Sequence, residues 1–170
     1  TPKLQKMIKL SIVIPTLNNI EYTAICVGSI LNNTTSDYQI VFVDDCSTDD
    51  TRAFLRNFPN ATVWLNAQPR GVTANWNKGI ELSKGEYVAI INNDIVLTKD
   101  WDTPLINALN DDTWVASPYH TAHALPSDFP NGIERHENGG FPLLGSCFLT
   151  KRSLYDTIGT FPEELKMWFN

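Results

Sequence analysis

The feature that most constrains the fold is a regular alternation of strand-like and helix-like segments between residues 8 and 91. Short runs rich in β-branched residues predict strands at residues 9–15, 39–45, 61–66 and 86–92. The segments between them have the apolar spacing or the capping residues of helices, at residues 19–34, 47–58 and 71–85. This order predicts an α/β fold with a mainly parallel central sheet and helices on both faces.

The pattern is less regular after residue 91, where a helix is predicted at 101–110, strands at 113–118 and 145–151, and a short helix at 152–159. The stretch from Pro118 to Pro142 has no periodicity and holds all three histidines, so we expect a functional loop that orders over a ligand. No repeat or linker divides the chain. We therefore expect one domain over residues 1–170, with Met7 as the natural start and residues 1–6 foreign to the natural protein.

Composition narrows the possible partners. The formal net charge of −6 argues against a general binder of nucleic acid or of anionic membranes, because both require a basic face. No apolar run approaches the ~18 residues that a membrane-spanning helix needs. The three cysteines are odd in number and lack the spacing of paired metal ligands, so we expect free thiols in a cytoplasmic protein.

Polar residues gather where the predicted strands end. Residues 15–19 follow the first strand, Asp44 and Asp45 close the second, and the segment 92–94, which ends in Asp94, follows the fourth. In an open parallel sheet, ligands bind outside the carboxyl ends of the strands, so we expect these aspartates to share one cleft. Carboxylates can accept hydrogen bonds from a nucleobase or a ribose, and they can hold a divalent cation that bridges two phosphates.

A second signal lies at the start of the third predicted helix. Gly71 permits close backbone approach to a phosphate at the helix N-terminus, and Arg70 adds a charged fork. The chain has no GxxxxGK(S/T) motif, which excludes a P-loop, and no GxGxxG after the first strand, which argues against a dinucleotide site. An acidic pair after a strand also occurs in receiver-like signalling domains, but the third predicted strand ends in WLNAQP, without their phosphoacceptor aspartate.

Four segments resemble, in order and spacing, the successive motifs of family 2 glycosyltransferases, in the NxD-variant, rhamnosyltransferase-like subgroup. The segments are SIVIPTLNN, VFVDDCSTDDT, RGVTANWNKGIELSKGEYVAIINND and GSCFLTKRSLYDTIGTFPEEL, and the match covers Ile8 to about Leu165. The resemblance implies a Rossmann-like GT-A fold and a nucleoside-diphosphate sugar donor of the UDP or dTDP type. It also implies a glycan, lipid-linked or protein hydroxyl as the acceptor.

The resemblance further implies roles for individual residues. Asp94 falls on the last position of the DXD motif and would ligate Mn2+ or Mg2+ on the diphosphate, while Asn92 replaces the first acid of that motif. The aspartate pair would hold base and ribose in a wet, ligand-facing cleft. The implied nucleotide-binding residues are Pro15, Thr16, Asn18, Asp44, Asp45, Arg70, Asn77, Asn92 and Asn93.

The general base is the part of the family pattern that this sequence does not show. Inverting members carry an acidic base shortly after the segment that here reads GTFPEELKMWFN, so the base is expected just beyond Asn170, with Glu164 as the nearest candidate. Two functions therefore stay open. One is a metal-dependent inverting glycosyltransferase of the hexosyltransferase type, and the other is a nucleotide-sugar-binding domain that is inactive because it lacks the base.

Overall fold

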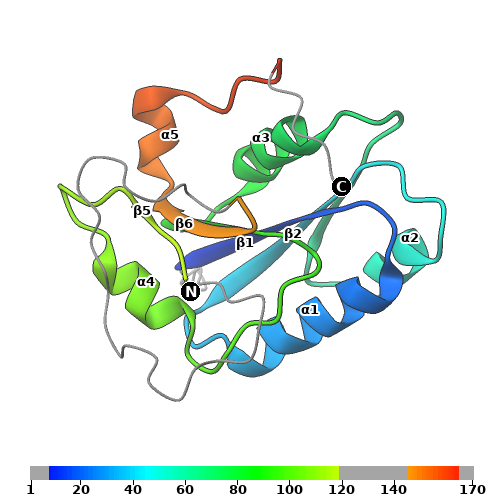
Figure 1. Ribbon diagram of the computed structural model, residues 1–170, viewed down its shortest axis with the longest axis horizontal. Helices are drawn as coiled ribbons and strands as arrows, with labels where there is room; N and C mark the ends of the chain where they lie inside the picture. Colours follow the sequence, from blue (N-terminus) through cyan, green and yellow to red (C-terminus); the bar gives the residue numbers. More distant parts are fainter. Residues whose placement is uncertain (1–7, 119–144, 165–170) are drawn as a thin grey trace, which may run out of the picture.

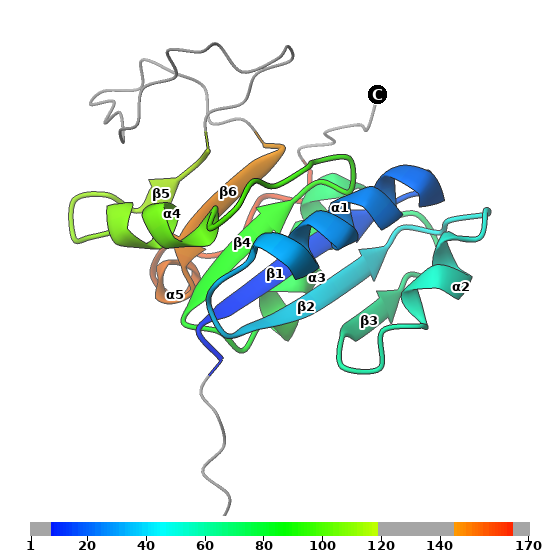
Figure 2. The same ribbon diagram turned by 90° about the horizontal axis from the view of Figure 1, so that it is seen from below.

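The computed structural model describes residues 8–118 and 145–164, and its centre is a six-stranded sheet. The strands lie in the order β3-β2-β1-β4-β6-β5 (Figure 2). They are β1 (Leu10–Thr16), β2 (Tyr38–Asp44), β3 (Thr62–Leu65), β4 (Tyr87–Ile91), β5 (Val115–Ala116) and β6 (Cys147–Lys151). The first four strands pair in parallel, whereas β6 is antiparallel to both β4 and β5. The prediction of a mainly parallel sheet is confirmed.

Helices cover both faces of this sheet (Figure 1). The helices α1 (Ile20–Asn33), α2 (Thr51–Leu55) and α4 (Asp102–Ala108) lie on one face, and α3 (Val72–Leu82) and α5 (Ser153–Ile158) lie on the other. The chain changes faces as it passes from β3 through α3 to β4, because β4 pairs with β1 on the side away from β2. This is a doubly wound arrangement, in which ligands bind outside the carboxyl ends of the strands.

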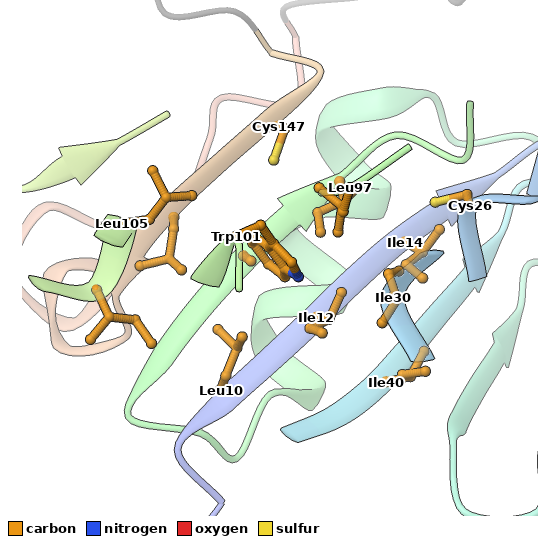
Figure 3. Packing of buried hydrophobic residues seen from close by; sticks show 14 of the residues in the cluster. Leu10, Ile12, Ile14, Cys26, Ile30, Ile40, Leu97, Trp101, Leu105 and Cys147 are labelled. Carbon is orange, nitrogen blue, oxygen red and sulfur yellow. The ribbon is translucent and has the colours of Figure 1, made fainter. Parts of the chain in front are cut away.

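Each layer of helices buries its own core against the sheet. The larger core lies under α1 and α4 and includes Ile12, Ile30 and Trp101 (Figure 3). The smaller core lies under α3 and includes Val13 and Trp76. Ile12 and Val13 belong to opposite cores because successive side chains of a strand point to opposite faces. Every residue of β1 is therefore buried, and β1 is the centre of the molecule.

The second predicted helix is shorter than its sequence pattern indicates. α2 has five residues, and neither Ser47 nor Thr48 caps it. Instead, Ser47 Oγ accepts a hydrogen bond from Asn18 N at 2.7 Å, and Thr48 N donates to Asn18 Oδ1 at 2.7 Å. The residues expected to begin this helix are thus held by the loop that follows β1.

Some of the predictions concern residues that the structure does not describe. The predicted functional loop lies outside the described residues from 119 to 142, and its three histidines, His120, His123 and His136, lie there too. The same holds for the chain beyond Glu164. In the described part, none of the helices combines the length and the apolar character needed to cross a membrane.

Candidate functional site at the carboxyl ends of the strands

Three neighbouring strands end on a buried side-chain oxygen that has no hydrogen-bond partner among the described residues. These oxygens are Thr16 Oγ1 at the end of β1, Asp44 Oδ1 at the end of β2, and Asn92 Oδ1 directly after β4. Thr16 and Asp44 are partners in the β1–β2 register, and β4 is the other neighbour of β1. An unsatisfied buried polar atom costs about 1–3 kcal/mol, so a group of them at one edge indicates a place where water or a ligand supplies the missing hydrogen bonds.

The three oxygens lie around the point where the winding of the sheet reverses. From β1 the sheet grows in one direction to β2 and in the other to β4. At such a switch point, the connections leave the strands in opposite directions and open a crevice at the carboxyl ends. Thr16, Asp44 and Asn92 were all expected to contact a nucleotide, and the structure brings them to this one edge.

Asp44 is fully buried, and its two oxygens have different surroundings. Oδ2 accepts hydrogen bonds from Arg52 Nε at 2.6 Å and from Ser47 N at 3.1 Å, whereas Oδ1 is the unpartnered oxygen. The hydrogen bond to Asp44 raises the pKa of Arg52, so the guanidinium stays charged. The expectation of a wet aspartate pair is wrong for Asp44, because Arg52 balances its charge and only Oδ1 is left for a ligand.

Asp45 is also buried, and its carboxylate holds the turn that precedes α3. Oδ1 accepts hydrogen bonds from Arg70 N at 2.7 Å and Asn66 Nδ2 at 3.0 Å, and Oδ2 accepts one from Gly71 N at 3.0 Å. Gly71 has a φ of 86°, in the left-handed region that glycine adopts without strain. The anion at this turn is therefore Asp45 itself, and the Gly71 N–H that was expected to meet a phosphate is already used.

Two asparagines that the sequence motifs did not single out connect the strand ends to α3. Asn66 Nδ2 donates to Asp45 Oδ1 and also to Asn75 Oδ1 at 2.7 Å. Asn75 is 1% exposed, and its Nδ2 is a buried donor without a partner among the described residues. The available sequence signal is positional, since Asn66 directly follows β3 and Asn75 lies in the first turn of α3. Asn75 adds a donor to the acceptors at the strand ends.

Asn18 and Asn93 support the loops around this edge. Asn18 has a φ of 56°, and besides its contacts with Ser47 and Thr48 its carbonyl oxygen accepts from Asn93 Nδ2 at 3.3 Å. Asn93 Nδ2 also donates to Thr23 Oγ1 at 2.9 Å. Pro15, a further expected nucleotide residue, is buried within β1. These hydrogen bonds give Asn18 and Asn93 a structural role at the edge of the site.

Asp94 is exposed and follows β4 at the same edge. Across residues 8–118 and 145–164, no three His, Cys, Asp or Glu side chains come together as a metal site. A cation that bridges two phosphates needs only one or two carboxylates from the protein rather than a closed cage. Asp94, with the unpartnered oxygen of Asn92 two residues earlier, offers the oxygen ligands that a hard divalent cation prefers.

Arg70 and Asn77 contact the segment that follows α5. Arg70 Nη2 forms an ion pair with Glu163 Oε2 at 3.0 Å, and both side chains are about half exposed. Asn77 Oδ1 accepts from Phe161 N at 2.9 Å, and Asn77 Nδ2 donates to Phe161 O at 2.8 Å. An exposed ion pair contributes about 1 kcal/mol or less, so Arg70 can exchange Glu163 for a phosphate at little cost. Asn77, in contrast, uses both ends of its amide to anchor the segment.

Two buried thiols of the described residues are excluded as nucleophiles. Burial raises the pKa of Cys26 and of Cys147 to about 12, so neither thiol ionises near neutral pH. All three cysteines are free, as predicted. Glu164, the nearest candidate for the base, is exposed at the end of the described part.

The sequence of motifs that forms this edge belongs to a known family. The family model described as "Glycosyl transferase family 2" matches residues 11–164, which include all the strand ends described above. The chain belongs to this family. Family 2 thus places the chain among the glycosyltransferases.

Related proteins and solved structures agree with membership of family 2. The uncharacterized glycosyltransferase RP339 of Rickettsia prowazekii (strain Madrid E) is 28% identical over 181 residues, which cover 94% of this chain and 57% of that protein. The structure of S. aureus TarS 1–349 in complex with UDP has a TM-score of 0.74 at 20% identity and covers 94% of this chain and 52% of that one. The mannosyltransferase PcManGT from Pyrobaculum calidifontis, in complex with GDP-Man and Mn2+, has a TM-score of 0.68 at 22% identity, with 93% and 48% covered.

These two structures share the GT-A fold with the family 2 domain described here. The chain spans 57% of the length of RP339 and about half of each of the two solved chains. The predicted fold and family are confirmed.

Proposed function

We propose that this chain binds a nucleoside-diphosphate sugar of the UDP or dTDP type and transfers its sugar, with inversion, to an acceptor hydroxyl. One observation carries the proposal, namely the buried, unpartnered oxygens of Thr16, Asp44 and Asn92 at the switch point of a family 2 domain. The TarS complex with UDP supports the nucleotide class. Asn92, in place of the first acid of the DXD motif, supports the NxD-variant subgroup.

In this proposal, Asp44 recognises the nucleobase of the donor. Its Oδ1 accepts a hydrogen bond from the ring N–H of uracil or thymine, and burial strengthens that bond because little water competes for it. Thr16 Oγ1 and Asn75 Nδ2 offer further contacts to the nucleoside. Asp45 acts through the turn that it holds, because its carboxylate is already taken by Arg70 N, Asn66 and Gly71 N.

The diphosphate end of the donor lies toward Asp94. This carboxylate would hold Mn2+ or Mg2+, which would offset the negative charge that develops on the departing nucleoside diphosphate. The PcManGT complex, which contains Mn2+, supports this choice of ion. Arg70 adds a positive charge once it leaves Glu163.

Transfer with inversion requires a carboxylate that takes the proton from the acceptor hydroxyl as its oxygen bonds to the anomeric carbon. From the resemblance to inverting members, we expect this group just beyond Asn170. Within the described residues, Glu164 is the candidate, since it is exposed, whereas Glu163 is engaged by Arg70 and Asn77. The acceptor itself is a glycan, lipid-linked or protein hydroxyl.

Titration calorimetry tests the donor assignment. UDP or dTDP should bind more tightly with Mn2+ than without it, whereas free uridine or thymidine should show little dependence on the ion because it has no diphosphate. Asp94→Asn should remove the dependence, since an amide is a much weaker ligand for the cation. Asp112→Asn, at another exposed aspartate, is the matched control and should leave the dependence intact.

Two results would contradict the assignment. One is a UDP and dTDP affinity that does not respond to Mn2+ in the unmodified chain. The other is an equal loss in the Asp94 and Asp112 variants, which would show a general charge effect rather than a ligand.

A further inference from the structure

A hollow lies beside the strand-end site, on the face of the sheet that α3 covers. It has a volume of about 750 Å3 and is open to solvent. Its walls are Trp64 on β3, the outward side of α3 from Ala74 to Glu81, and the segment after α5 that includes Thr160 and Glu163. We call it the α3 groove. The α3 residues that line it cover two helical turns, about 10 Å of helix axis, so the groove is longer than one sugar ring.

Trp64 is the main apolar surface of the α3 groove. It lies on β3, an edge strand, and its register partner Val43 belongs to the core under α3, so both side chains point to that face. Trp64 is 41% exposed although two side chains contact its indole ring. Lys78 Nζ lies 4.4 Å from its ring centroid, and its Nε1 donates to Asn66 Oδ1 at 2.9 Å. These two contacts fix the orientation of the indole while one of its surfaces stays exposed to solvent.

The charges that line the α3 groove cancel. Lys78 Nζ pairs with Glu81 Oε2 at 2.6 Å, and Arg70 pairs with Glu163 at 3.0 Å. The lining as a whole does not attract a charged ligand, because its two positive and two negative side chains have no net charge. A neutral ligand can form hydrogen bonds with these four charged side chains. Because their charges cancel, the groove does not favour an ion over such a ligand.

The α3 groove also presents polar groups that are free to bind. Gln68 and Thr160 are exposed at its rim and have no hydrogen bond to any other described residue. A cavity of this size with an aromatic surface and a few convergent polar groups is typical of a small-molecule site. The C–H faces of a sugar ring carry partial positive charge and pack on the negative face of an indole, while its hydroxyl groups bond to amides and carboxylates.

We propose that the α3 groove binds an uncharged oligosaccharide. The ring of one sugar unit packs on Trp64, and its hydroxyl groups bond to Gln68, Thr160 and the carboxylate of Glu81. The groove meets the strand-end site at Arg70, but it shares none of the unpartnered oxygens there. It is a separate binding site, and a glycan held in it lies beside the edge where the donor is proposed to bind.

The test is titration of the 170-residue chain with three neutral trisaccharides and one acidic one. The neutral probes are the trimer of N-acetylglucosamine, cellotriose and maltotriose, and the acidic probe is a trimer of galacturonic acid. At least one neutral trimer should bind, and the acidic trimer should bind at least tenfold more weakly than that one. Trp64→Ala should weaken the neutral trimer at least tenfold, because the sugar loses its stacking surface, and Gln68→Ala should weaken it less.

Trp114→Ala is the matched control, because Trp114 is also exposed but lies next to β5 at the opposite edge of the sheet. It should leave the affinity for the trimer unchanged. UDP affinity in the presence of Mn2+ should be unchanged in both variants, which separates this site from the donor site. The proposal is overturned if no neutral trimer binds, if Trp64→Ala has no effect, if the acidic trimer binds as well, or if Trp64→Ala also removes UDP binding.

Discussion

At the scale of single residues, the site depends on which polar atoms the fold leaves without a partner. Thr16 is an example, because it is fully buried and its hydroxyl has no hydrogen bond within the described part. Such an atom lowers the stability of the protein without a ligand and adds to the affinity once a ligand reaches it. Thr16 therefore allows stability and binding to be separated in one substitution.

We expect Thr16→Val to leave the free energy of unfolding unchanged or to raise it by about 1 kcal/mol, while UDP affinity falls. Valine has nearly the shape of threonine, so the change removes only an unsatisfied hydroxyl. Urea unfolding measures the first quantity and titration calorimetry with Mn2+ the second. The matched control is Thr150→Val, whose buried hydroxyl bonds to Tyr155 Oη at 3.1 Å. It should cost about 1 kcal/mol of stability and leave the affinity unchanged. A Thr16 variant that loses stability and binds UDP normally would contradict this account.

At the scale of elements, the position of α3 depends on a close approach to β1. A methyl group at Gly79 would lie only 2.1 Å from Val13 Cγ1, so the helix packs on the strand through the bare backbone of this residue. A methyl group at Gly85, just after the helix, would lie 2.7 Å from Ser11 N and 2.8 Å from the carbonyl carbon of Leu10. These contacts bring the first turn of α3, with Asn75, toward the carboxyl ends of the strands.

We expect Gly79→Ala to destabilise the protein by about 1–3 kcal/mol, because the added methyl group forces Val13 or the helix to move. The gain in helix propensity, about 1 kcal/mol, offsets only part of this cost. Gly28→Ala in α1 is the matched control, since a methyl group there meets nothing within 4 Å. That variant should be as stable as the unmodified chain or more stable by up to about 1 kcal/mol. Equal unfolding midpoints for both variants would argue against the close packing of α3 on β1.

At the scale of the whole molecule, one buried carboxylate ties the end of α1 to the start of α4. Asp102 is fully buried, and its oxygens accept hydrogen bonds from Thr35 N at 3.0 Å and Ser36 N at 2.8 Å. Nearby, Trp101 Nε1 donates to Thr34 Oγ1 at 3.0 Å. Burial alone raises the pKa of Asp102, but the hydrogen bonds from Ser36 and Thr35 outweigh it and lower the pKa below its ordinary value.

The hydrogen bonds to the Asp102 carboxylate make the stability of the fold depend on pH. A carboxylate whose pKa is lowered on folding stabilises the folded state above its unfolded pKa, about 3.9, and this contribution is lost as the pH falls through the folded pKa. We expect Asp102→Asn to cost about 1.5–3 kcal/mol at pH 7, because an amide cannot accept both backbone hydrogen bonds in the same way. The difference from the unmodified chain should shrink as the pH falls below the unfolded pKa of about 3.9. Urea unfolding at pH 7 and pH 3 measures it, and a difference that stays constant across this range would show that ionisation of Asp102 is not involved.

The sequence alone was sufficient for the order of the elements, and it placed the candidate site residues at one edge of the sheet. The strand predicted at residues 39–45 is observed at Tyr38–Asp44, and the helix predicted at 19–34 is observed at Ile20–Asn33. These patterns are local, because β-branched runs and helical spacing are set by near neighbours in the chain. That Asp44, Asp45 and Asp94 share one edge then follows from the rule that neighbouring parallel strands end on the same side of the sheet.

Only the tertiary structure decided which atoms at that edge are free. Asp44 and Asp45 are adjacent and chemically identical in the sequence. Within the described part, the Asp45 carboxylate accepts hydrogen bonds from residues 66–71 on both oxygens, whereas Asp44 keeps one oxygen unpartnered. The donors that make this difference lie up to 26 residues away along the chain, so no local pattern contains them. Whether a buried oxygen can meet a ligand depends on the number of donors that folding brings to it, and that number exists only once the strands and α3 have packed together.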